Sequence, residues 1–146
     1  VIVASCGGFP KDISLYQGTK TIDNIESGLK PGGTLILIIE AREGGGPVEY
    51  FDWAKDLVAG TIEQRLREHF TVAGYIFFLN CEQAQRYNIL LYSSIAPEDV
   101  APMGIKAFSD VNALLDAAQL EGKSIYVIPN GSTVIPHVKE ASKHEA

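Results

Sequence analysis

The chain has 146 residues, of which 46% are hydrophobic and 21% are charged, and this suits one globular domain with its own core. A net charge of −6 argues against binding to nucleic acid or an anionic membrane surface, and the longest apolar run, Leu35 to Ile39, is far too short to span a bilayer. The sequence starts at Val1, inside an expected strand. We therefore expect a domain excised from a longer protein.

Two cysteines, Cys6 and Cys81, belong to no Cys-x-x-Cys motif and to no Cys/His cluster with metal-ligand spacing. A disulfide between them stays open at this point, but a chain with an adequate core does not depend on one. We expect reduced cysteines and a cytoplasmic protein. Cys6 has no base near it in the sequence that would activate it as a nucleophile.

The first elements are a strand, a helix and a second strand. Residues 1–5 are an apolar run that ends in Cys6, Gly7 and Gly8, which predicts a buried strand followed by a loop. Asp12 or Ser14 can cap a helix that continues to about residue 29. The uninterrupted apolar run over residues 34–39 is typical of a parallel strand buried on both faces.

A polar, glycine-rich loop over residues 40–46 precedes a helical region. Pro47 suits the first position of a helix over residues 48–57. Thr61 opens a capping-box pattern that predicts another helix, and its core face would carry Ile62, Leu66 and Phe70. Residues 72–85 have strand propensity at their centre and helix propensity at their end, and we favour a helix.

The second half of the chain continues the alternation. A strand over residues 89–92 is followed by a short helix from Pro97 and a short strand over residues 105–108. Asp110 caps a further helix that Gly122 closes, and the last strand covers residues 124–128. The charged tail from Lys139 to Ala146 is expected to fray.

This alternation predicts an α/β fold: a mostly parallel sheet with flanking helices in a three-layer, Rossmann-like domain. Ligands of such sheets bind beyond the carboxyl ends of the strands. Five loops are therefore expected at one edge, and they comprise residues 6–10, 40–46, 93–94, 109–110 and 130–133.

The best candidate for ligand binding is the glycine loop and the helix that follows it. Gln17 and Lys20 are three residues apart and share a helix face, with Tyr16 beside them. A carboxylate could take a charge-assisted hydrogen bond from the Lys20 ammonium and another from the Gln17 amide. The alternative is structural: Ser14 and Gln17 have capping-box spacing, and Lys20 is then a solvated surface lysine.

Other polar groups carry a weaker signal. The loop with Glu40 and Arg42 offers charges after a buried strand, but solvation explains them. The glycine runs lack both phosphate-loop and dinucleotide-fold spacing. His69, His137 and His144 do not follow a predicted strand, which favours surface histidines.

The run from Ala4 to Asp12, with its Gly-Gly-x-Pro pattern, and the Tyr-Gln-x-x-Lys pattern of residues 16–20 resemble the C-terminal domain of the nickel-dependent lactate racemase family. Further matching stretches are residues 29–34, 40–44 and 129–133, so the resemblance covers most of the chain. It implies an isomerase that interconverts stereoisomers of a 2-hydroxy acid by hydride transfer to a nickel-pincer nucleotide.

The resemblance also implies that the functional residues are divided between two domains. Gln17 and Lys20 would bind the substrate, while Tyr16, Gly7 and Gly8 would contact the cofactor. The cofactor-tethering lysine, the nickel-binding histidine and the acid/base histidines belong to an N-terminal domain absent from residues 1–146. This chain would then hold no catalytic residue and no metal ligand, and would be inactive alone. Cys6 stands where a small polar residue is expected.

Two other functions stay open. The stretch from Leu29 to Thr34 before a strand also occurs in methyltransferase-like domains, although no acidic G-x-G loop precedes it. The second alternative is a non-catalytic module that binds a small acid or mediates assembly. Saturable binding of S-adenosylmethionine would favour the first, and tight binding of small acids by the domain alone would favour the second.

Overall fold

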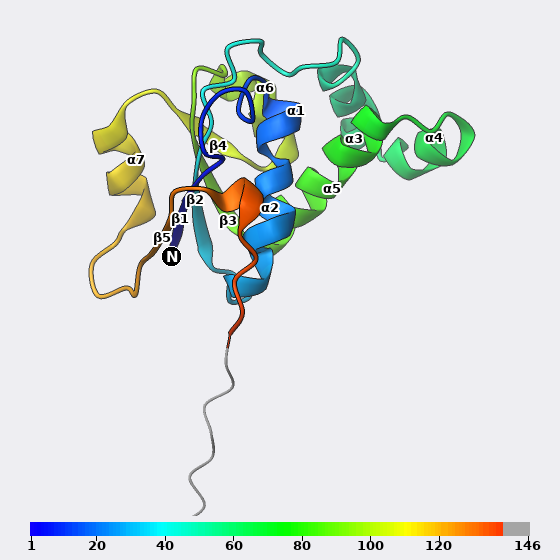
Figure 1. Cartoon of the computed structure of the whole chain (residues 1–146). Helices are drawn as coiled ribbons and strands as arrows, with labels where there is room; N and C mark the ends of the chain where they lie inside the picture. Colours follow the sequence, from blue (N-terminus) through cyan, green and yellow to red (C-terminus); the bar gives the residue numbers. More distant parts are fainter. Residues whose placement is uncertain (139–146) are drawn as a thin grey trace, which may run out of the picture.

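A computed structural model describes residues 1–138 and shows a five-stranded sheet with the order β4-β3-β2-β1-β5 (Figure 1). All neighbouring strands pair in parallel. The strands are β1 (Ile2–Ser5), β2 (Thr34–Ile38), β3 (Asn88–Tyr92), β4 (Lys106–Phe108) and β5 (Tyr126–Ile128). The tail over residues 139–146, for which we expected fraying, lies outside the described residues.

The helices form layers on the two sides of this sheet (Figure 1). One side carries α1 (Leu15–Gly18), α2 (Lys20–Ile25), α3 (Ala54–Ala59), α4 (Ile62–Glu68), α5 (Val72–Arg86) and α6 (Pro97–Val100). The other side carries α7 (Val111–Ala118). Within residues 1–138, short 3-10 helices span Glu26–Gly28, Phe51–Trp53, Ala101–Met103 and Gly131–Thr133. The α/β prediction is confirmed.

The apolar run of β2 explains why both faces of the sheet are covered. Leu35 and Leu37 belong to the large core under α1, α2 and α5, whereas Ile36 packs with Leu114 and Ala118 of α7. Successive side chains of a strand point to opposite faces, so a continuous apolar run buries itself on both. No helix within residues 1–138 is both long and apolar enough to cross a membrane.

The ambiguous stretch over residues 72–85 is helical, as favoured from the sequence. The Thr71 side chain caps α5 by accepting a hydrogen bond from the Gly74 N–H at 3.0 Å. The fully buried Phe77 then packs into the large core. Asp110 caps α7 as predicted, because its Oδ1 accepts from the Ala113 N–H at 2.8 Å.

Several local predictions were wrong in detail. Gln119, in a left-handed conformation, closes α7, three residues before the expected Gly122. The expected helix from Ser14 to residue 29 is divided at Thr19, where the Ile22 N–H donates to the Thr19 carbonyl at 2.9 Å, a 3-10 spacing. Residues 47–50 form a turn, closed by a 2.9 Å bond from the Tyr50 N–H to the Pro47 carbonyl, and regular structure starts only at residue 51. Phe70 does not face the core: α4 ends at Glu68, so Phe70 leaves the helix face and is 65% exposed.

Candidate functional site

The topology places a crevice at the carboxyl ends of β1 and β5. The connections from β1 to β2, β3 and β4 lie on one side of the sheet, whereas α7, between β4 and β5, lies on the other (Figure 1). Such a reversal is where ligands of open parallel sheets bind. The loops after these two strands meet there, because the Ser132 Oγ donates a hydrogen bond to the Cys6 carbonyl at 2.6 Å.

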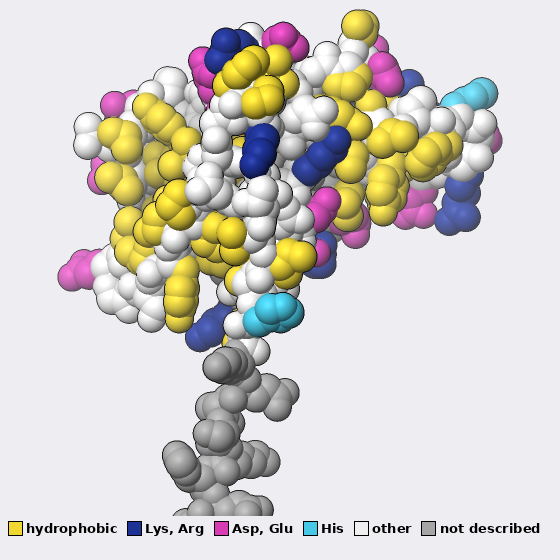
Figure 2. All heavy atoms as spheres, in the orientation of Figure 1, with side chains coloured by type: hydrophobic (Ala, Val, Ile, Leu, Met, Phe, Trp, Pro, Cys, Tyr) yellow, Lys and Arg dark blue, Asp and Glu magenta, His cyan; other side chains and the backbone are white. Residues whose placement is uncertain are grey.

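A hollow of about 440 Å³ lies beside this crevice. Gln17, Lys20, Asp23 and Asn24 of α1 and α2 form one wall. Lys11 from the loop after β1, Ile76 of α5 and Ser132 from the loop after β5 complete the lining. Figure 2 shows two cationic side chains in the middle of this face, with hydrophobic side chains gathered over the arm that holds α3, α4 and α5.

Tyr16, Gln17 and Lys20 form one connected unit. The Lys20 Nζ donates to the Gln17 Oε1 at 3.0 Å and lies 4.2 Å from the centroid of the Tyr16 ring. The Tyr16 ring in turn meets the buried Tyr50 ring edge-on at a centroid distance of 6.1 Å. The ammonium is thus held in place while two of its three N–H groups remain for a ligand.

The close packing of α1 against the sheet positions the Tyr16, Gln17 and Lys20 side chains. A Cβ on Gly18 would lie 2.6 Å from Ile39, so glycine alone permits this approach. The buried Cys6 thiol donates to the Gly18 carbonyl at 3.4 Å, and Ser14 caps the helix by accepting from the Gln17 N–H at 3.4 Å. Ser14 is therefore an N-cap, but the expected capping box is not closed, because the exposed Gln17 side chain bonds to Lys20.

The two loop glycines lie apart from the hollow's lining. Gly7 has φ +96° and Gly8 has φ +77°, which are left-handed values that favour glycine. A Cβ on Gly7 would lie 2.8 Å from the Asn130 Oδ1, whereas a Cβ on Gly8 would meet no atom within 4 Å. Gly7 thus serves the contact between the two loops, whereas Gly8 has open space beside its Cα and its carbonyl accepts a hydrogen bond from the Lys11 N–H at 2.9 Å.

Cys6 is a structural residue. It is fully buried, and burial raises the pKa of its thiol above the usual value, which keeps it protonated and unreactive. Both cysteines are free. His69 and His137 are exposed, and neither lines the hollow. Within residues 1–138, no three His, Cys, Asp or Glu side chains lie close enough together to hold a metal ion.

Other charged loop residues are tied to each other. Arg42 pairs with Glu40 at 3.2 Å and lies 4.5 Å from the centroid of the Phe9 ring. Ser94 donates its hydroxyl to the Glu40 carbonyl at 2.6 Å, which joins the loops after β2 and β3. These contacts hold the edge of the sheet together outside the hollow.

Several residues of the lining were not predicted from the sequence, and they include Lys11, Asp23, Asn24 and Ile76. Asn24 follows Lys20 by four residues, so helical spacing would have found it. Ser132 belongs to a loop that was expected at this edge. Ile76 carries no local signal, because only the packing of α5 beside α1 brings it to the hollow.

Comparisons with known proteins agree with this fold. Residues 1–136 match the model of the lactate racemase C-terminal domain. A lactate racemase of Thermoanaerobacterium thermosaccharolyticum is 32% identical over 56 residues, which cover 38% of this chain and 13% of the relative.

The structure of the lactate racemase apoprotein from the same organism has a similar fold. Its TM-score is 0.76 at 24% identity, and the match covers 92% of this chain but 34% of that one. The chain thus spans about a third of that structure's length. On the match over residues 1–136, the chain belongs to the lactate racemase C-terminal domain family.

Proposed function

We propose that this chain is the C-terminal, substrate- and cofactor-binding domain of a two-domain racemase-like enzyme that interconverts the stereoisomers of a 2-hydroxy acid. The observation that carries the proposal is the pairing of Lys20 with Gln17, at 3.0 Å, in the hollow beside the β1–β5 crevice. Family membership and the length of the related racemase support the expectation of a further domain.

The substrate carboxylate would bind at this pair. Lys20 has free N–H groups beyond its bond to Gln17, and the Gln17 amide nitrogen has no hydrogen-bond partner within residues 1–138. A carboxylate could accept from both, one charge-assisted bond and one neutral bond. Because Lys20 is already oriented by Gln17 and by the Tyr16 ring, binding would cost little additional side-chain entropy.

The cofactor would lie along the same edge. Open space beside the Cα of Gly8 and the half-buried Tyr16 ring next to Lys20 support a contact of these residues with one side of a nickel-pincer nucleotide. When bound, that group would accept a hydride from the hydroxy acid and return it to either face. The part played by this chain is to fix the carboxylate, so that the substrate's chiral carbon keeps one position during the reaction. The groups that tether the cofactor and move protons are expected in the other domain.

Binding of lactate by the chain tests this proposal. In a titration followed by amide NMR shifts, we expect millimolar affinity and shifts that centre on residues 17–20. Lys20→Ala should weaken binding about tenfold or more, the effect of losing a charged hydrogen bond worth about 1.5–3 kcal/mol. Lys30→Ala removes the same charge at the amino ends of the strands, just before β2, and should not change lactate binding. Equal affinity of wild type and Lys20→Ala would refute the assignment.

A further inference from the structure

The hollow contains a second cation that the carboxylate-binding pair does not use. Lys11 comes from the loop after β1, where its N–H donates to the Gly8 carbonyl at 2.9 Å. Its ammonium has no hydrogen bond or ion pair with any of residues 1–138, in contrast to Lys20. All three of its N–H groups therefore stay available to a ligand.

The neighbouring polar groups do not neutralise Lys11. The carboxylate of Asp23 is the only acidic side chain in the described lining, and its Oδ1 accepts from the Gln83 Nε2 at 2.7 Å. The hollow therefore holds two ammonium groups and one carboxylate, and that carboxylate is turned toward α5. An anion is the ligand that balances the remaining charge.

Apart from the Gln17 amide, the side chains of Ser132 and Asn24 are the neutral donors in the described lining, and each already donates a hydrogen bond within the protein. The Ser132 hydroxyl donates to the Cys6 carbonyl at 2.6 Å, and the Asn24 Nδ2 donates to the Gly131 carbonyl at 3.2 Å. A monocarboxylic acid that binds Gln17 and Lys20 would leave the Lys11 ammonium without a counter-charge. The 440 Å³ of the hollow exceeds what such a small acid fills, so space remains for another group.

We propose that this hollow recognises two anionic groups, the substrate carboxylate at Lys20 and Gln17 and a second anion at Lys11. The inference rests on the proposed function and narrows it. The second anion is either another carboxylate on the substrate, which makes the substrate a 2-hydroxy dicarboxylic acid, or a phosphate of the nucleotide cofactor. Both use the same charge-assisted contact, so Lys11 determines substrate specificity in the first case and binds the cofactor in the second.

Parallel titrations of the chain with L-lactate, L-malate and inorganic phosphate test this inference at constant ionic strength, followed by amide NMR shifts. If the second group is a substrate carboxylate, malate should bind about fivefold more tightly than lactate, which is the effect of one favourable, partly solvated ion pair. Lys11→Ala should then remove this preference without changing lactate binding, and Lys11→Arg should retain it.

If the second group is a phosphate, malate and lactate should bind equally, and Lys11→Ala should weaken phosphate binding by a similar factor. Lys30→Ala is the matched control for the loss of one positive charge away from the hollow, and it should affect none of the three ligands. The inference is overturned if Lys11→Ala leaves malate and phosphate binding unchanged. Failure of the proposed function gives a different result, namely lactate binding that is insensitive to Lys20→Ala.

Discussion

Replacing Gly18 by alanine tests how the fold positions the ligand-binding helix. The new Cβ would lie 2.6, 2.7 and 2.8 Å from three side-chain atoms of Ile39. Favourable contacts between carbon atoms are about 3.5–4.0 Å, so α1 or Ile39 must move by roughly 1 Å. Ile39 is fully buried, so its side chain packs tightly against its neighbours. Overpacking of this kind costs about 1–3 kcal/mol, against which the better helix propensity of alanine returns at most about 1 kcal/mol.

The expected result is a net loss of about 1–2 kcal/mol in the free energy of unfolding, measured by urea denaturation. The double variant Gly18→Ala/Ile39→Ala provides the control, because removal of the Ile39 side chain removes the clash. Its loss of stability should be smaller than the sum of the two single losses by about 1 kcal/mol or more. A Gly18→Ala variant as stable as the wild type, or strict additivity in the cycle, would refute the close seating of α1.

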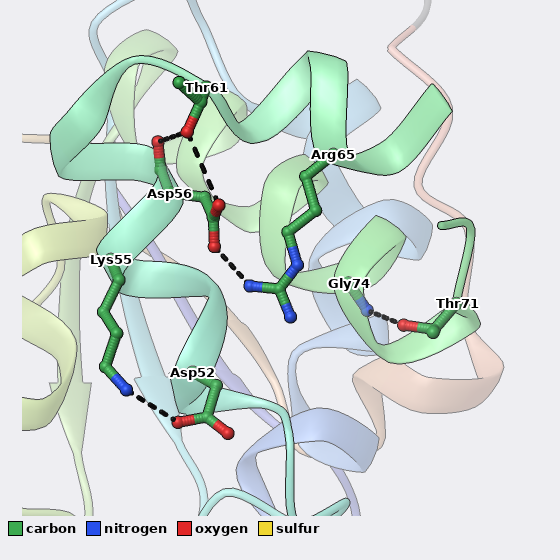
Figure 3. A network of polar contacts seen from close by, with 7 residues as sticks. All are labelled: Asp52, Lys55, Asp56, Thr61, Arg65, Thr71 and Gly74. Carbon is green, nitrogen blue, oxygen red and sulfur yellow. Dashed lines mark hydrogen bonds and ion pairs between the residues drawn. The ribbon is translucent and has the colours of Figure 1, made fainter. Parts of the chain in front are cut away.

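Three further predictions concern stability and activity. Gly74→Ala would place a Cβ 2.2 Å from the buried Trp53 ring, and it should cost about 1–3 kcal/mol in urea unfolding. Gly74 lies at the start of α5, near the polar contacts that join Asp56 of α3 to Thr61 and to Arg65 of α4 (Figure 3). Stability should fall as the pH rises above the usual thiol value of 9.0, because burial raises the pKa of Cys6 and raises that of Cys81 to about 12. Each thiol then loses its proton at a lower pH in the unfolded chain than in the folded one, so the free energy of unfolding falls by up to about 1.4 kcal/mol per pH unit for each thiol. A free energy of unfolding that stays constant from pH 8 to pH 10 would contradict the burial of both thiols. The chain alone should neither take up nickel nor racemise lactate, and robust activity from residues 1–146 would contradict the proposed division between domains.

The sequence was informative where a local pattern decides the structure. The apolar run of β2 predicted a doubly buried parallel strand, and the Asp110 cap predicted the start of α7. The alternation of strands and helices placed the loops after β1 and β5 at one edge, and the contact from Ser132 to the Cys6 carbonyl confirms that they meet.

Predictions failed where distant contacts override local preference. Residues 47–50 read as the start of a helix, but the buried Tyr50 packs against Phe77 of α5 at a ring-centroid distance of 5.5 Å, and the chain turns there instead. Ile76 reaches the hollow only because α5 packs beside α1. Helical spacing alone places Lys20 beside Gln17, so their contact could be predicted from the sequence. That the Lys11 ammonium has no partner within residues 1–138 follows only from the three-dimensional structure.

The most direct test of the central claim is whether one site on this chain binds both enantiomers of a 2-hydroxy acid. A racemase must accept either stereoisomer as substrate, so D-lactate and L-lactate should shift the same amides around residues 17–20, with dissociation constants within about threefold of each other. Lys20→Ala should weaken both to the same extent. Binding of a single enantiomer, or shifts that centre away from Gln17 and Lys20, would contradict the account.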